Sequence, residues 1–417
     1  MESPFPEPNS TIRDSPIQES AVRNEATPSG KPVRVLIVDD SAIVRRVLSD
    51  TLAKSPGIEV VGTAPDPYVA RNKILSLEPD VITLDIEMPR MDGITFLRRL
   101  MRYHPKPVIV ISSIATDGSQ RAMDALRFGA VDVVPKPGGP YSVGELKEDL
   151  PRKIRAAASA RLRIVSPESH LARLSSPHGS GGASLVERNE ANATDLHYAG
   201  EAASTFHRDN TAESVCLPFR RPGAPEWSLI AIGASTGGTQ AVEAILRNVP
   251  VACPPIVVTQ HIPAGFSTSF AHRLNSVCAP SVREAKDGDA LVPGVVLVAP
   301  GGFHLRVRGK ESAMFVRLDD GPKVCYQRPS VDVLFESITD VKLRTAVAVL
   351  LTGMGSDGAQ GMLALRRNGL HTIAESEETC VVFGMPREAI RLNAAAEVQP
   401  LFRIAHSLGY AVERKPV

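Results

Sequence analysis

The sequence has 417 residues, of which 47 are Lys or Arg and 46 are Asp or Glu, so its formal net charge is +1. This length allows two or three domains with cores of their own, and the near-neutral charge argues against nucleic acid as a partner. The five cysteines include no C-x-x-C pair, which argues against a zinc site or a disulfide framework. No apolar run approaches the roughly 18 residues of a membrane span, and no signal peptide begins the chain. We therefore expect a cytoplasmic protein without direct membrane insertion.

Changes in composition divide the chain into four predicted parts. Residues 1–30 are rich in Pro, Ser, Glu and Asn, which predicts a disordered N-terminal tail. Residues 31–163 alternate apolar strands with helical patterns and predict a first α/β domain. Residues 164–225 are polar and rich in Gly, Ser and Ala, which is typical of a flexible linker, here longer than a hinge requires. The α/β texture then returns and predicts a second domain over residues 226–417.

Apolar runs place the strands of both α/β domains. In the first domain, the expected strands cover residues 33–40, 58–64, 79–86, 107–113 and 130–137. In the second domain, the expected strands cover residues 229–233, 255–260, 295–300, 346–351 and 371–374. Segments with apolar residues at helical spacing separate the strands. The fold class is therefore α/β, with a doubly wound five-stranded domain followed by a second doubly wound domain built on a parallel sheet.

Polar side chains follow four strands of the first domain. Asp39 and Asp40 end the first strand, Asp85 ends the third, Ser112 ends the fourth and Lys136 follows the fifth. These ends meet at one sheet edge, where three carboxylates repel one another unless a cation such as Mg²⁺ joins them. Mg²⁺ and the lysine would neutralise a phosphoryl group on a carboxylate, and the serine hydroxyl could hydrogen-bond it. Taken singly, each acid could instead cap a helix or lie in a loop.

The segments VDDS, LDIEMPRMDG, ISS and PKP occur in this order, and together they resemble the receiver domain of two-component response regulators over about residues 33–163. The resemblance implies that Asp85 accepts a phosphoryl group from a sensor histidine kinase. It also implies that Ser112 is the switch hydroxyl and that Lys136 pairs with the phosphate. A Mg²⁺ site is implied as well, with the ligands Asp39, Asp40, Asp85 and the backbone carbonyl of Glu87.

The stretch GASTG at residues 233–237 lies between a strand and a helix, as the G-x-S-x-G nucleophile elbow does. A dinucleotide-binding loop is the rival interpretation, because a helix N-terminus also binds phosphate. That loop needs a glycine where Ser235 stands and an acid about 20 residues further on. His261 instead ends the next strand, on the same sheet edge, where it can take the proton of the serine.

A carboxylate is needed to orient such a histidine, and Asp357 follows a later strand in a glycine-rich loop. Ser235, His261 and Asp357 therefore form the predicted triad. His304 remains a competing base because it also follows a strand. Asp332 remains a competing acid, although it is better explained as the cap of the helix that begins beside it. His261 could also be an ordinary, partly exposed histidine.

The second domain carries five longer segments in fixed order: IGASTGGTQAVEAIL, QHIPAGFSTSFAHRLN, VAPGGFHL, RPSVDVLFES and LLTGMGSDGAQGM. Following a receiver, they resemble the protein-glutamate methylesterases and glutamine deamidases of bacterial chemotaxis. The resemblance implies that Ser235, His261 and Asp357 are nucleophile, base and acid, that Met354 contributes to the oxyanion hole, and that the esterase chemistry needs no cofactor. The implied substrates are glutamate methyl esters and glutamines of methyl-accepting chemotaxis receptors. The order Ser, His, Asp differs from that of ordinary α/β hydrolases.

Two other classes of protein fit less well. A nucleotide-binding or oxidoreductase module lacks its second glycine and its acid, and a DNA-binding regulator lacks a helix-turn-helix pattern and a basic charge. Because the phosphate and ester chemistries lie in different domains, we expect control to be steric. The first domain would cover the working face of the second until phosphorylation shifts the balance toward an open state.

Overall fold

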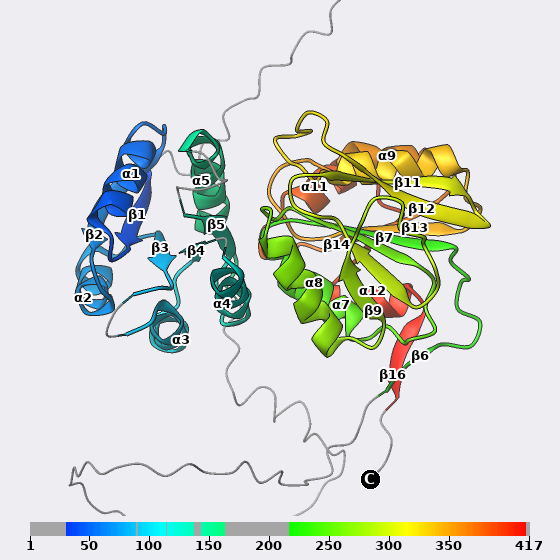
Figure 1. Cartoon of the computed structure of the whole chain (residues 1–417), viewed down its shortest axis with the longest axis horizontal. Helices are drawn as coiled ribbons and strands as arrows, with labels where there is room; N and C mark the ends of the chain where they lie inside the picture. Colours follow the sequence, from blue (N-terminus) through cyan, green and yellow to red (C-terminus); the bar gives the residue numbers. More distant parts are fainter. Residues whose placement is uncertain (1–30, 89–90, 114, 137–142, 163–216, 414–417) are drawn as a thin grey trace, which may run out of the picture.

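The structure, a computed structural model, shows two α/β units side by side (Figure 1). It describes residues 31–88, 91–113, 115–136, 143–162 and 217–413. The predicted N-terminal tail and most of the predicted linker lie outside these ranges. No helix in them is long and apolar enough to cross a membrane.

The first unit is a parallel sheet with the strand order β2-β1-β3-β4-β5. Its strands are β1 (Val33–Val38), β2 (Ile58–Ala64), β3 (Val81–Asp85), β4 (Val108–Ser112) and β5 (Asp132–Pro135). Its helices are α1 (Ala42–Ala53), α2 (Pro67–Leu77), α3 (Gly93–Tyr103), α4 (Thr116–Arg127) and α5 (Val143–Ala158). Helices α1 and α5 pack on one face, and α2, α3 and α4 pack on the other. The predicted doubly wound five-stranded fold is confirmed.

Local sequence explains where these helices begin. Asp66 accepts hydrogen bonds from the backbone N–H groups of Tyr68 and Val69, and Pro67 fits the first turn of α2 because that position needs no donor. Asp92 caps α3 in the same way through Thr95. Strands β1, β3 and β4 are almost wholly buried and consist mostly of Val, Ile and Leu, as expected for strands covered on both faces, whereas the edge strand β2 is partly exposed.

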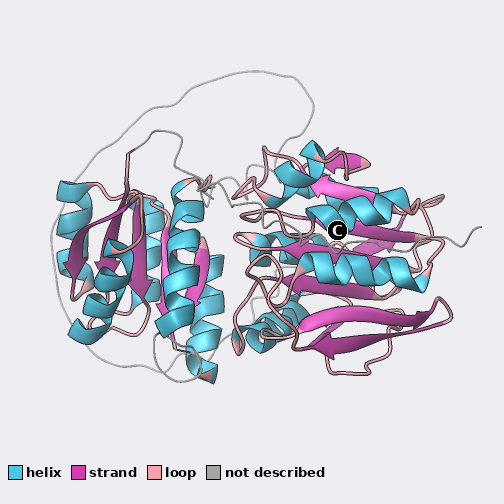
Figure 2. Cartoon of the chain, turned by 90° about the horizontal axis from the view of Figure 1, so that it is seen from above, coloured by secondary structure: helices cyan, strands magenta, loops and turns pink. Residues whose placement is uncertain are grey.

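The second unit is a parallel sheet with the order β15-β14-β13-β7-β8-β10-β9. Its strands are β7 (Leu229–Ala234), β8 (Ile256–Gln260), β9 (Ser281–Glu284), β10 (Val295–Val298), β13 (Ala346–Leu350), β14 (His371–Glu375) and β15 (Glu397–Gln399). Its helices are α7 (Gly238–Leu246), α8 (Phe266–Val277), α9 (Val331–Val341), α10 (Ala359–Arg367), α11 (Met385–Arg391) and α12 (Leu401–Ser407). Helices α7, α8 and α12 cover one face, and α9, α10 and α11 cover the other. Figure 2 shows the strands of both units with helices packed beside them. This confirms the second doubly wound fold.

Two antiparallel pairs of strands complete the second unit. Strands β11 (His304–Lys310) and β12 (Ala313–Asp319) form a hairpin, and β6 (Leu217–Arg220) pairs with β16 (Tyr410–Glu413). Strand β6 starts inside the segment expected to be linker. The last residues of that segment therefore differ from the expectation, because they are held by hydrogen bonds to the end of the second unit.

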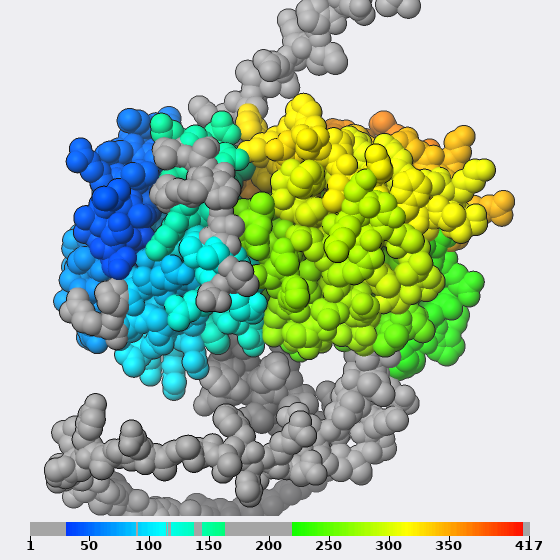
Figure 3. All heavy atoms as spheres, viewed as in Figure 1, coloured from blue at the N-terminus to red at the C-terminus, as the bar shows by residue number. Residues whose placement is uncertain are grey.

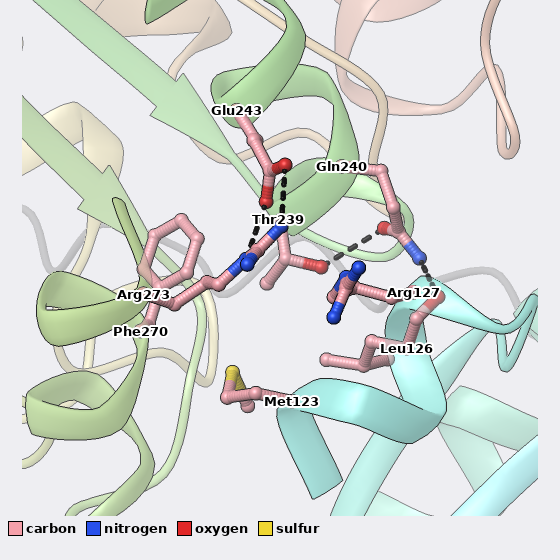
Figure 4. Close-up of a pocket in the computed structure, with 8 residues that line it drawn as sticks. All are labelled: Met123, Leu126, Arg127, Thr239, Gln240, Glu243, Phe270 and Arg273. Atoms are coloured by element: carbon pink, nitrogen blue, oxygen red, sulfur yellow. Dashed lines mark hydrogen bonds and ion pairs between the residues drawn. The ribbon is translucent and has the colours of Figure 1, made fainter. Parts of the chain in front are cut away.

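The two units touch along one side (Figure 3). Helix α4 packs against α8 and α7, and buried residues of both units belong to one continuous apolar cluster. Gln240 donates a hydrogen bond to the carbonyl of Leu126 at 2.6 Å, close to the ion pair between Glu243 and Arg273 (Figure 4). The carboxyl edge of the second sheet lies at this contact, as the site below shows.

Candidate functional site

Ser235 directly follows β7, at the place where the strand order of the second sheet reverses. Strands β8, β9 and β10 lie on one side of β7, and β13, β14 and β15 lie on the other. Such a reversal opens a crevice at the carboxyl ends of the strands. Gly237, the residue just before α7, has a φ of 78°, so the chain turns sharply soon after the serine. Ser235 is 8% exposed.

His261 and Asp357 follow the two neighbouring strands and meet beside Ser235. His261 comes directly after β8, and its backbone N–H donates to the carbonyl of Ala234 at 3.0 Å. Asp357 lies in the loop after β13, and its Oδ2 is 2.7 Å from His261 Nε2. The other ring nitrogen, Nδ1, is buried and has no hydrogen-bond partner among the residues described. Nδ1 is therefore the ring nitrogen that is available to accept a proton.

The N-terminus of α9 holds Asp357 in its ionised form. The Oδ1 atom of Asp357 accepts hydrogen bonds from the Ser330 hydroxyl at 2.7 Å and the Asp332 backbone N–H at 3.1 Å. Its Oδ2 atom accepts from the Val331 N–H at 2.7 Å. Burial raises the pKa of Asp357, but the bonds from His261, Ser330 and Val331 outweigh it and leave the pKa below its usual value. The N-terminus of a helix also favours a negative charge, because its unpaired backbone N–H groups carry partial positive charge.

The structure separates the competing candidates. His304 Nδ1 accepts the backbone N–H of Ser330, and its Nε2 is 2.9 Å from the carbonyl of Pro322, so both nitrogens are engaged with backbone. Asp332 does not cap α9, because Ser330 caps it through the Val333 N–H. The side chain of Asp332 lies instead in the first turn, next to Asp357.

The loop after β13 also approaches the serine closely. A Cβ on Gly353 would lie 2.5 Å from the Cβ of Ser235, so only glycine fits there. The Ser235 N–H donates to the carbonyl of Thr352 at 3.0 Å, which fixes the two loops together. Met354 follows directly, and its backbone N–H donates to no other group in the part of the chain that the structure describes.

The predicted carboxylates of the first unit meet at its sheet edge. Asp39, Asp40 and Asp85 each offer an oxygen within 4.8 Å of the others, and Asp39 and Asp85 are fully buried. Burial and the charge of Asp85 raise the pKa of Asp39 to about 6. Burial also raises the pKa of Asp85, although Lys136 opposes it. The Oδ2 atom of Asp39 has no partner among the described residues, so the residues present fit a cation with oxygen ligands.

The other residues predicted for this edge surround the carboxylates. Lys136 Nζ is 2.8 Å from Asp85 Oδ2 and 4.0 Å from Glu87 Oε2. The backbone N–H of Glu87 donates to Asp85 Oδ1 at 2.9 Å. Ser112 is buried and donates to the carbonyl of Gly118 at 3.0 Å, so in this state its hydroxyl is directed to the start of α4.

The first unit contacts the residue next to the serine. The hydroxyl of Thr236 donates to Asp132 Oδ2 at 2.6 Å, and the Lys153 ammonium is 2.7 Å from Asp132 Oδ1. Asp132 begins β5, and Thr236 is only 3% exposed. A buried charge-assisted bond of this kind joins the two units at the base of the nucleophile turn.

Further contacts surround this bond. Arg161 forms an ion pair with Glu377 at 2.6 Å, and its backbone N–H donates to the carbonyl of Val381 at 2.9 Å. The guanidinium of Arg152 lies over the ring of Tyr326, 5.2 Å from its centroid. Together these contacts cover the edge that carries Ser235 with α4, β5 and α5.

Sequence reasoning missed the groups that support and cover the site. Ser330 could have been found as a serine before a helical pattern, the usual signal of an N-cap. Asp132 and Thr236 gave no comparable signal, because they are 104 residues apart and each is unremarkable in its own segment. Their contact depends on how two folded units meet.

These features define a class: an α/β unit with a Ser-His-Asp arrangement at a switch point, covered by a receiver-like unit. A model described as "Response regulator receiver domain" matches residues 35–146, and one described as "CheB methylesterase" matches residues 230–408. Protein-glutamate methylesterase/protein-glutamine glutaminase 2 of Syntrophus aciditrophicus is 44% identical over 376 residues, covering 90% of this chain and 98% of that protein. The chain belongs to the protein-glutamate methylesterase/protein-glutamine glutaminase family.

Two further relatives are similar. Protein-glutamate methylesterase/protein-glutamine glutaminase 4 of Anaeromyxobacter dehalogenans is 46% identical over 373 residues, covering 89% of this chain and 93% of that protein. The crystal structure of the Thermotoga maritima CheB methylesterase catalytic domain is 41% identical, covers 44% of this chain and 97% of its own, and has a TM-score of 0.42.

Proposed function

We propose that this chain is a phosphorylation-regulated hydrolase that removes methyl esters from glutamates of chemoreceptors, with release of methanol. It also deamidates receptor glutamines, with release of ammonia. The observation that carries the proposal is the contact of His261 with Asp357 beside Ser235, at a strand edge covered by the receiver unit. The printed names of the relatives support the choice of glutamate esters and glutamine amides as substrates.

The chemistry follows from the free ring nitrogen. Ser235 Oγ attacks the ester carbonyl while His261 Nδ1 takes its proton, and Asp357 stabilises the imidazolium through Nε2. The backbone N–H of Met354 meets the developing oxyanion. The tetrahedral intermediate then expels methoxide, which takes the proton from His261 and leaves as methanol. Water repeats the sequence on the acyl-enzyme and restores the glutamate.

Deamidation uses the same groups with a poorer leaving group. The amine must receive the imidazolium proton before the C–N bond breaks, so His261 has to act as a strong general acid. We expect this reaction to be slower than ester hydrolysis. Neither reaction requires a cofactor in the second unit.

The receiver unit supplies the control. Asp85 would accept a phosphoryl group from a sensor histidine kinase, with Asp39, Asp40 and the Glu87 carbonyl holding Mg²⁺. Mg²⁺, when bound, supplies positive charge that offsets the charge of the phosphoryl oxygens. Lys136 already contacts Asp85 and would pair with the phosphate. Ser112 would turn from Gly118 toward the phosphate and so alter the start of α4, which packs on the second unit.

Masking of the serine explains how that change reaches the active site. A receptor helix bundle is bulky, so a receiver unit that contacts Thr236 and covers the strand edge excludes it. Phosphorylation would weaken the docked state and raise the fraction of open molecules. We place this chemistry in the cytoplasm, where the modified helices of the receptors lie.

Methanol release from methyl-labelled receptor membranes tests the function. We expect the full chain to release methanol slowly, and a small-molecule phosphodonor with Mg²⁺ to raise the rate by tenfold or more, about 1.4 kcal/mol of docking free energy. Asp85→Asn should remain at the basal rate. A chain of residues 213–417, which keeps β6 paired with β16, should be fast without phosphodonor. No methanol from either chain would reject the proposed activity, and a slow truncated chain would reject masking.

Mg²⁺ should stabilise the receiver unit in a pH-dependent way. Because the pKa of Asp39 is raised to about 6 from 3.8, its contribution to folding is favourable when it is protonated and is lost as the pH rises through 6. Mg²⁺ replaces the lost proton, so thermal unfolding of the full chain at pH 7.5 should shift upward with Mg²⁺, by about 2.7 kcal/mol at 100 times Kd. At pH 5 protonation of Asp39 should weaken Mg²⁺ binding about tenfold, so the same Mg²⁺ concentration should give about half of that stabilisation.

Two variants check that effect. Asp39→Asn should remove the response to Mg²⁺, whereas Glu59→Gln, an exposed acid on β2, should keep it. An equal Mg²⁺ response in the Asp39 variant would show that the cation binds elsewhere.

A further inference from the structure

Asp332 and Asp357 form a pair of buried carboxylates. Asp332 is 6% exposed and Asp357 is 1% exposed, and each offers an oxygen within 4.8 Å of the other. The backbone N–H of Asp332 also donates to Asp357 Oδ1 at 3.1 Å. On its far side, Asp332 Oδ1 accepts the backbone N–H of Gly361 at 2.7 Å. The acid that competed with Asp357 in the sequence therefore touches it in the fold.

The two members of the pair have unequal surroundings. Asp357 receives hydrogen bonds from a hydroxyl and two backbone N–H groups and contacts His261, which together stabilise its charge. No cation pairs with Asp332 in the ranges that the structure covers, and its Oδ2 faces the Cys325 thiol, 3.9 Å away. Two adjacent carboxylates away from water do not both ionise readily, so the proton stays on the less supported one.

The other titratable groups around Asp332 reinforce this division. Burial and the neighbouring acids raise the pKa of the Cys325 thiol to about 12, so it is neutral. Glu336, one turn further along α9, is exposed and adds negative charge. Burial, the charge of Asp357 and a hydrogen bond with it raise the pKa of Asp332 to about 7.

We propose that Asp332 is a positioning residue of the triad. As a neutral carboxylic acid it holds Asp357 against His261, and when it ionises its charge makes the His261 imidazolium hold its proton more firmly. This inference rests on the proposed function. It assigns Asp332 no contact with the substrate, and its effect passes through Asp357.

The chemistry needs both abilities of His261 at one pH. The imidazole must take a proton from Ser235 and then release it to the leaving group. A second negative charge beside Asp357 would favour proton uptake by His261 but would hinder release of that proton to the leaving group. While Asp332 is neutral, the two carboxyl groups together carry a single negative charge. This favours the step in which His261 protonates the leaving group.

Paired substitutions in the full chain separate charge from position. Asp332→Asn keeps an acceptor for Gly361 and a donor for Asp357 but cannot ionise. Relative to wild type, we expect its kcat/KM profile to lose the inflection that accompanies ionisation of Asp332, because the asparagine side chain stays neutral at every pH. Asp332→Ala loses both contacts, and its kcat should fall about 10- to 100-fold with KM unchanged. The asparagine should therefore rescue the alanine variant.

Two readouts make the outcome decisive. Methanol release with phosphodonor reports turnover, and the rate of Ser235 labelling by a fluorophosphonate reports the serine and histidine without any receptor. Asp340→Asn is the matched control, since it removes an exposed charge near the far end of the same helix, where Asp340 pairs with Arg308, and its profile should not move. If Asp332→Asn leaves both profiles in place, or is as slow as Asp332→Ala, the proposal is overturned. Should the alanine variant fail to fold, the asparagine profile alone decides.

The same readouts separate this inference from the proposed function. If wild type reacts with the fluorophosphonate but releases no methanol, the substrate assignment fails. The role of Asp332 is then still decided by the pH dependence of labelling.

Discussion

Replacing Ser235 with Ala is expected to abolish methanol release, lowering the rate by at least about 10⁴-fold. In the proposed mechanism its hydroxyl is the nucleophile, and a methyl group cannot form the acyl-enzyme. The substitution should leave the fold intact, because the change removes one atom and no described hydrogen bond depends on it. The measurement is methanol release from labelled receptor membranes, together with phosphate uptake by the receiver unit.

Phosphate uptake serves as the internal control for that variant. It should equal that of wild type, since the phosphorylation site lies on another sheet. Ser281→Ala, an exposed serine on β9, should retain full activity. Activity of the Ser235 variant within tenfold of wild type would rule out the nucleophile assignment.

Asp357→Asn is expected to lower kcat by about 10⁴-fold while preserving the fold. Asp357 accepts from His261 Nε2, which leaves Nδ1 free to take the serine proton. The amide would donate to Nε2 instead, so the ring proton would move to Nδ1 and the base would be lost. The acid limb of the residual activity should also move to lower pH, because the imidazolium has lost its counter-charge.

His304 provides the comparison for the predicted base. Both of its nitrogens contact backbone groups, so His304→Gln should cost far less than His261→Gln in the same methanol assay. Equal losses in the two variants would make the choice of base unsafe.

The sheets were predictable because their strands are continuous apolar runs between helical patterns. The hairpin β11–β12 was not, because its residues alternate between buried and exposed and include several arginines, which hides it from a search for apolar runs. Strands β9, β15, β6 and β16 are only three or four residues long, so pairing with a neighbour decides whether they form at all.

The candidate site also has residues whose grouping could be predicted from the sequence and residues whose grouping could not. The end of a parallel strand fixes where a side chain lies, so Ser235, His261 and Asp357 could be grouped from sequence alone. The proximity of Asp332 to Asp357 could not, because it depends on how α9 packs against the loop after β13. The contact of Asp132 with Thr236 depends on a still larger event, the docking of two complete units.

The contact of Asp132 with Thr236 would also carry an effect from the second unit back to the receiver unit. If docking couples the two units, linkage requires the coupling to be reciprocal. A receptor segment that displaces Asp132 from Thr236 then lends part of its binding free energy to the open receiver, and so to the form that carries phosphate. The substrate thereby acts as an effector of Asp85 as much as phosphate at Asp85 acts as an effector of catalysis. Under the proposed function, receptor binding would therefore favour the phosphorylated form of the protein at equilibrium.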